Sequence, residues 1–137
     1  MKMGNDWRAY PSLLFGLVKM SYKLFLDDIR DVERVFSHTD TSCFITVRSY
    51  DKFLGCISKN GLPEFISFDN DLGVDKNGEV TLDGYAACKW LVYESGLNLI
   101  NLRYNVHSAN PVAAKQIAGL LDGYIRFLKN ENGALKR

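Results

Sequence analysis

The stretch YKLFLDD at residues 22–28 decides the fold class of this chain of 137 residues. Its apolar run ends abruptly at Asp27 and Asp28, which is typical of a buried strand whose carboxyl end meets solvent. The same pattern returns at residues 64–73, EFISFDNDLG, where a second apolar run ends in acidic and amide side chains. Both runs are therefore predicted to be buried strands that end at the solvent.

Strand-like runs and helix-like periodicity alternate along the rest of the chain. The predicted strands are residues 22–26, 43–47, 64–68 and 102–106. The predicted helices are residues 29–36, 50–60, 84–95 and 111–128, the last three capped by Ser49, Asp83 and Asn110. Residues 74–82 are expected to form a turn or a small hairpin. Four strand–helix units predict an α/β domain with a mainly parallel four-stranded sheet and helices on both faces.

The length of the chain allows one compact domain, which we place at residues 21–130. An N-terminal extension at residues 1–20 and a frayed C-terminal tail at residues 131–137 complete the predicted organisation. The extension contains an apolar run, residues 13–18, that is far too short to cross a bilayer. Hydrophobic residues make up 47% and charged residues 24% of the chain, so a globular core is expected.

Charge and cysteine content narrow the class of partner and the compartment. The formal net charge is +1, which is too small for non-specific attraction to nucleic acid or to an anionic membrane. We therefore expect no membrane association and no extended nucleic-acid groove. The three cysteines, Cys43, Cys56 and Cys88, are flanked by apolar residues. They are interpreted as reduced core thiols of a cytoplasmic protein.

Carboxylates gather at one edge of the predicted sheet, because the carboxyl ends of parallel strands meet there and bind ligands. They are Asp27, Asp28, Asp69 and Asp71. Such a group repels itself and raises its own pKa values unless a cation neutralises it. A divalent metal, Mg²⁺ by ligand type, is the simplest cation. The alternative is that Asp28 and Asp71 are caps. Asparagine at Asp27 or Asp69 is expected to relieve the repulsion and to leave the protein at least as stable.

Residues after the fourth strand suit proton transfer and phosphate binding. His107 follows that strand directly and could act as a general acid or base near neutral pH. The acidic cluster is expected to raise its pKa above the ~6.5 reference value. Ser108, Asn110 and Arg30 could bind phosphoryl oxygens. Asn110 is equally explained as the N-cap of the helix that begins at Pro111.

Four motifs, LFLDDIR, FISFDNDLG, DGYAACKWL and VHSANPVAAK, together resemble the cyclic-phosphate-processing receiver-like family, a divergent relative of response-regulator receiver domains. The resemblance implies a receiver-like (flavodoxin-like) three-layer sandwich with strand order 2-1-3-4. It also implies a phosphoesterase that acts on cyclic phosphates of nucleotides or RNA ends, in RNA repair or in conflict systems often linked to phages. By position, the family's motif residues correspond to Asp27 and Asp28 after the first strand, Asp69 and Asp71 after the third, and His107, Ser108 and Asn110 after the fourth.

The sequence differs from this family at one position and from ordinary receiver domains at another, which leaves other functions open. Asn70 stands where the family motif commonly has histidine, so this residue can bind substrate but cannot act as a base. Compared with ordinary receivers, the chain has no fifth strand and no lysine at its end. We therefore favour cyclic-phosphate hydrolysis by His107, Asp69 and Asp27. The alternatives are a receiver that accepts phosphate on Asp69 and a non-catalytic module that binds a cyclic nucleotide or a protein.

Overall fold

The computed structural model describes residues 14–15, 18–19 and 21–135 of the chain. Its strands are β1 (Leu14–Phe15), β2 (Val18–Lys19), β3 (Lys23–Leu26), β4 (Phe44–Val47), β5 (Phe65–Phe68) and β6 (Arg103–Val106). Its helices are α1 (Val32–Val35), α2 (Tyr50–Asn60), α3 (Gly84–Tyr93) and α4 (Pro111–Leu135). The four strands and four helices predicted for the domain are all present.

The central sheet has the order β4-β3-β5-β6, and all three pairings are parallel. Counted over the predicted strands, this is the order 2-1-3-4, so the prediction is confirmed. Three backbone hydrogen bonds extend the ladder beyond the strands, from Asp27 to Val47, from Asp69 to Leu26 and from His107 to Phe68. These bonds fix Asp27, Asp69 and His107 side by side at the carboxyl edge of the sheet.

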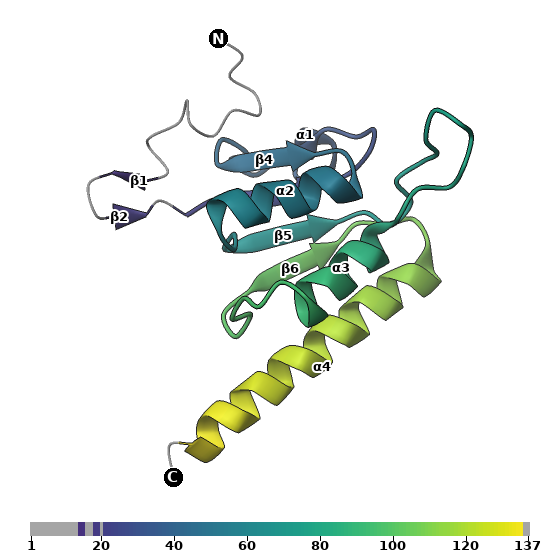
Figure 1. The fold of residues 1–137 in the computed structure, drawn as a ribbon. Coiled ribbons are helices and arrows are strands. Elements are labelled where there is room, and N and C mark those ends of the chain that lie inside the picture. The colour runs from purple at the N-terminus through teal and green to yellow at the C-terminus, as the bar shows by residue number, and fades with distance from the viewer. Residues whose placement is uncertain (1–13, 16–17, 20, 136–137) are drawn as a thin grey trace.

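Helices lie on both faces of the sheet, which gives the expected three-layer receiver-like fold. In Figure 1, α2 and α3 cover one face, α4 runs alongside α3, and α1 lies behind β4. The face under α2 and α3 presents a fully buried apolar row that includes Leu24 and Ile66. On the opposite face, the ring of Phe36, directly after α1, packs against the rings of Phe44 and Phe65.

The helix predicted at residues 29–36 is shorter than expected, because α1 begins only at Val32. The carboxylate of Asp27 accepts hydrogen bonds from the backbone N–H groups of Ile29 and Arg30, which holds these residues in a turn. Ile29, the first residue of the predicted helix, lies outside α1 and is 79% exposed. The local preference for a helix is therefore overridden by a carboxylate that belongs to the site.

All three predicted N-caps are confirmed. Ser49 accepts a hydrogen bond from the N–H of Lys52, and Asp83 accepts one from Ala86. The side chain of Asn110 accepts from Val112 and Ala113 at the start of α4.

The last helix begins at Pro111 as predicted but is longer than expected. It continues to Leu135, past the expected boundary at residue 130, because the residues beyond that boundary are mostly good helix formers. Val112 was expected on its apolar side but is exposed. Ile117 and Leu121, which were also expected on that side, are buried together with Ala113, and the three are spaced four residues apart.

The remaining predictions outside the sheet have mixed outcomes. Most of the expected extension at residues 1–20 lies outside the described residues, and of it the structure describes only the antiparallel pair β1 and β2. The expected hairpin is confirmed by an antiparallel bridge between Val74 and Val80. Cys56 and Cys88 are buried as predicted, whereas Cys43 is exposed because it precedes the edge strand β4. Among the described helices, none combines the length and the apolar character that a bilayer span requires.

Candidate functional site

Asp27 is the most fully bonded residue at the carboxyl edge of the sheet. It directly follows β3, and only 1% of the residue is exposed. Its Oδ1 accepts from the N–H groups of Ile29 and Arg30, at 2.9 and 2.8 Å. Its Oδ2 lies 2.8 Å from Arg30 Nε and 3.0 Å from His107 Nε2. Burial raises the pKa of Asp27, but these hydrogen bonds outweigh it and hold the pKa below its ordinary value. Asp27 is therefore a permanent anion at neutral pH.

Asp69 directly follows β5 and is also buried. Its Oδ1 accepts from the N–H of Asn70 at 2.8 Å and lies 3.5 Å from Nη2 of Arg30. Among the described residues, none donates a hydrogen bond to its Oδ2. Burial raises the pKa of Asp69 to about 6, and the negative charge of Asp27 adds to the rise. Near neutral pH this carboxyl group can both take up and release a proton.

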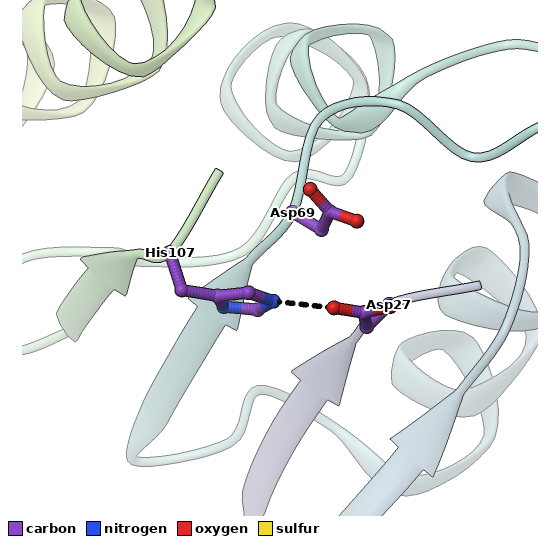
Figure 2. A group of neighbouring side chains, drawn as sticks. All are labelled: Asp27, Asp69 and His107. Carbon is purple, nitrogen blue, oxygen red and sulfur yellow. Dashed lines mark hydrogen bonds and ion pairs between the residues drawn. The ribbon is translucent and has the colours of Figure 1, made fainter. Parts of the chain in front are cut away.

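His107 connects β6 to Asp27 through a ring that is only 5% exposed (Figure 2). Its Nδ1 lies 2.7 Å from Oγ of Ser67, and its ring stacks on Phe25 at 4.6 Å between centroids. Burial lowers the pKa of His107 below its ordinary value, although Asp27 acts in the opposite direction. The expectation of a raised pKa was therefore wrong, because the ring lies inside the protein and its cost of charging exceeds the attraction of one carboxylate.

Arg30 supplies the positive charge at the centre of the site. Its guanidinium contacts both Asp27 and Asp69, at 2.8 and 3.5 Å. It therefore provides part of the positive charge beside the two buried acids that the sequence assigned to a metal. The turn that carries Arg30 is held by Arg48, which pairs with Asp31 at 2.7 Å and donates to the carbonyl oxygens of Asp27 and Arg30. With about a third of its side chain exposed, Arg30 can still reach a phosphoryl group from solvent.

Asn70 is buried and serves to hold the start of α3. Its Oδ1 accepts from the N–H of Tyr85 at 3.1 Å, and its carbonyl oxygen accepts from Gly84. Its Nδ2 donates to Asp71, whose side chain is otherwise exposed. The amide therefore has structural partners on both sides, and binding of substrate by Asn70 stays a prediction.

Ser108 and Asn110 lie in the turn between β6 and α4. Ser108 Oγ accepts from the backbone N–H of Asn110 at 3.0 Å. The side-chain oxygen of Asn110 caps the helix, as its alternative interpretation stated. The side-chain oxygens of both residues thus already accept hydrogen bonds from nearby backbone N–H groups. Their donor groups stay available to a phosphate, which remains a prediction.

The structure brings together three of the predicted metal-site and catalytic residues. Ligand atoms of Asp27, Asp69 and His107 lie within 4.8 Å of one another and could hold a metal ion. Two carboxylates suit a hard divalent cation by their chemistry. Arg30, however, already contacts oxygens of both carboxylates, so a cation would compete with it. Asp28 lies outside the group, although its charge contributes to the raised pKa of Asp69.

Three residues of the site were missed by the sequence reasoning. Ser67 and Phe25 contact the His107 ring, and Gly84 lets α3 approach β5. A Cβ on Gly84 would lie 1.9 Å from the carbonyl oxygen of Asp69, so no side chain fits there. A signal for Ser67 did exist, because it is the one polar residue inside the run FISF and lies two positions before Asp69, on the same face of the strand.

The comparisons with known proteins identify the domain. The family model of the cyclic-phosphate processing receiver domain matches residues 22–123 of the sequence. These residues include every strand of the central sheet and the whole of the site described above. No curated protein and no solved structure matches the chain.

Proposed function

Because the chain belongs to the cyclic-phosphate processing receiver domain family, we propose that it is a phosphoesterase that opens cyclic phosphates of nucleotides or RNA ends. The observation that carries this proposal is the position of Arg30 between Asp27 and Asp69. It supplies a cation for the phosphoryl group next to a carboxyl group whose pKa is about 6. A ring-opening phosphoesterase needs both, one to stabilise charge and one to move the proton of water.

The proposed reaction is addition of water to phosphorus with loss of one ring oxygen. A bond forms between the water oxygen and phosphorus, and the bond from phosphorus to one ester oxygen breaks. The water gives up one proton to a side chain, and the departing ester oxygen takes up one proton. Asp69 and His107 are the candidates for this transfer, while Arg30 stabilises the phosphoryl charge. Asp27 orients the guanidinium of Arg30, and Ser108, Asn110 and Asn70 complete the proposed binding surface.

For a metal-assisted form of the reaction we propose Mg²⁺, with Asp27 and Asp69 as the side chains that would hold it. Bound there, the ion would supply further neutralisation of the phosphate. Asp28 and Asp71, which lie outside this group, remain proposed as further metal ligands. Because Arg30 contacts the same two carboxylates, the ion and this side chain would compete for them. In the absence of an ion, Arg30 alone would bind the phosphoryl group. We further propose that the protein acts in the cytoplasm, consistent with its free thiols.

The decisive test is turnover of cyclic phosphates by the full chain. The substrates are the four 2′,3′-cyclic nucleotides and an RNA that ends in a cyclic phosphate, each with and without Mg²⁺. We expect ring opening by the wild type and by Asp51→Asn, which changes an exposed acid on α2 that forms no hydrogen bond or ion pair with the site residues named above. Asp69→Asn should be inactive. Absence of ring opening with every substrate would refute the phosphoesterase, and thermal stabilisation by one of them would then favour a binding module.

A receiver that accepts phosphate on Asp69 is the second candidate. One observation favours it: Oδ2 of Asp69 accepts no hydrogen bond from the described residues and could attack a phosphoryl donor. Incubation with acetyl phosphate distinguishes the two functions. A switch predicts a stable label that Asp69→Asn abolishes, together with no ring opening by the wild type. The phosphoesterase predicts ring opening by the wild type and no stable label on Asp69.

A further inference from the structure

Ser67 is a buried polar residue in the middle of an apolar strand. It is completely inaccessible to solvent, between Ile66 and Phe68 of β5. A hydroxyl in such a place is costly unless both its donor and its acceptor capacity are used. Ser67 satisfies this requirement with two side chains from the neighbouring strand, Asn105 on β6 and His107 directly after it. Its Oγ lies 2.7 Å from Nδ1 of His107 and 3.3 Å from Nδ2 of Asn105.

The chemistry of these groups gives the hydrogen bonds a direction. The amide nitrogen of Asn105 can only donate, so Ser67 Oγ accepts from it. At the other end, the ionised carboxylate of Asp27 can only accept, so Nε2 of His107 carries a hydrogen. A neutral imidazole has one N–H, and Nδ1 must therefore accept the hydrogen of the Ser67 hydroxyl. The bonds run in one direction, from Asn105 through Ser67 and His107 to Asp27.

We propose that Ser67 and Asn105 are positioning residues that hold His107 as a hydrogen-bond donor to Asp27, which leaves Asp69 as the group that accepts the proton of water. In this arrangement neither ring nitrogen of His107 offers a lone pair to the site. Nδ1 is engaged by Ser67, and Nε2 is protonated and faces Asp27. The stacking of the ring on Phe25, at an interplanar angle of 4°, restricts rotation that would exchange the nitrogens.

The inference assigns both proton transfers to one carboxyl group and in this respect rests on the proposed function. Asp69 takes the proton of the attacking water through its open Oδ2 and gives the same proton to the departing ester oxygen. Protons balance without an additional acid. A neutral His107 could not supply the second proton, since that would leave an imidazolate. His107 instead keeps Asp27 oriented toward Arg30.

The tautomer of His107 is measurable without any substrate. In the full chain with ¹⁵N-labelled histidine, two-bond proton–nitrogen correlations at a pH where the ring is neutral distinguish the two nitrogens. His38, which is exposed, gives the reference spectrum of an averaged tautomer in the same sample. We expect His107 to show one protonated nitrogen, Nε2, and one hydrogen-bonded acceptor, Nδ1. A proton on Nδ1 in the wild type would overturn the inference.

Two variants test whether Ser67 and Asn105 set this state. Ser67→Ala should move the Nδ1 resonance to that of a nitrogen without a donor. Asn105→Asp replaces the amide donor by an acceptor for the Ser67 hydroxyl and should transfer part of the ring proton to Nδ1. Thr46→Ala is the matched control, because Thr46 lies in the same cross-strand row on β4. It should leave the His107 spectrum unchanged. Spectra of Ser67→Ala and Asn105→Asp identical to the wild type would contradict the inference.

Turnover then separates this inference from the proposed function. If the protein opens cyclic phosphates, Ser67→Ala should lower kcat by about 10- to 100-fold with little change in KM. Thr46→Ala should keep wild-type turnover. An inactive wild type with the expected spectra would refute the phosphoesterase and leave the hydrogen-bond direction intact. An active wild type with turnover unaffected by Ser67→Ala would refute the positioning role.

Discussion

Arg30 donates a hydrogen bond from Nε to Oδ2 of Asp27 at 2.8 Å, and this is the oxygen that also accepts from the imidazole of His107. One carboxylate oxygen thus holds the cation and the ring of the site in fixed positions. The charge of the carboxylate cluster is partly neutralised from within the chain. Any divalent ion that binds here has to compete with a guanidinium that is covalently tethered three residues away.

This competition predicts the metal response of the protein. Mg²⁺ should raise the melting temperature of the wild type moderately, and Arg30→Gln should increase that effect, because the carboxylates then lack their internal cation. Asp27→Asn and Asp69→Asn should diminish it. Thermal melts at increasing Mg²⁺ measure the shifts, with Asp51→Asn as the control. An identical response of all five proteins would exclude the metal site.

The two central aspartates should respond oppositely to replacement by asparagine. Asp69→Asn should raise the free energy of unfolding at pH 7 by about 1–3 kcal/mol, because the buried charge disappears. Asp27→Asn should lower it by about 1–3 kcal/mol, because an amide cannot accept all the hydrogen bonds that the carboxylate accepts. Urea unfolding without metal measures both changes. We therefore keep the sequence-based prediction of relieved repulsion for Asp69→Asn and replace it for Asp27→Asn.

The gain from Asp69→Asn should depend on pH. The folded protein binds the Asp69 proton with a pKa of about 6, and the unfolded chain with a pKa near the ordinary value of 3.8. Between these values the folded state holds more protons, so the wild type becomes more stable as the pH falls. The advantage of the variant should be complete above pH 6 and should disappear toward pH 4. An advantage of equal size at pH 4 and pH 7 would show that its cause is not ionisation.

Glutamine at position 107 distinguishes a hydrogen-bond donor from a proton carrier. If His107 serves to donate to Asp27, His107→Gln should retain much of the turnover, because its amide can make the same bond. His107→Ala should lose about 10²- to 10⁴-fold. Steady-state kinetics on the best cyclic phosphate measures both. Equal loss in the two variants would indicate that the imidazole itself transfers the proton.

Gly84 should be essential for the shape of the site. A methyl group there would collide with the backbone of Asp69, so Gly84→Ala should cost about 1–3 kcal/mol of stability and should also impair turnover. Gly123→Ala on α4 is the matched control, since nothing lies within 4 Å of a Cβ at that position. It should stabilise the helix by about 0.5–1 kcal/mol. Urea unfolding measures both variants, and a neutral Gly84→Ala would contradict the close packing.

The sequence by itself determined the framework. Apolar runs ending in acid predict parallel strands, and Ser49, Asp83 and Asn110 mark helix starts, because these signals are local and involve residues a few positions apart. The convergence of Asp27, Asp69 and His107 at one edge also follows from the alternation of strands and helices, since parallel strands end together. The chemical role of each residue at that edge does not follow from the order of strands and helices.

Tertiary structure decided the chemical state of the site. His107 lies 80 positions from Asp27, and only the folded arrangement shows that burial, against Phe25, lowers the pKa of its ring although a carboxylate is adjacent. In the same way, the sequence placed Arg30 near the rim, but its position between two carboxylates depends on the turn that Asp27 itself imposes. Burial and hydrogen-bond direction depend on all neighbours at once, and a linear pattern does not contain them.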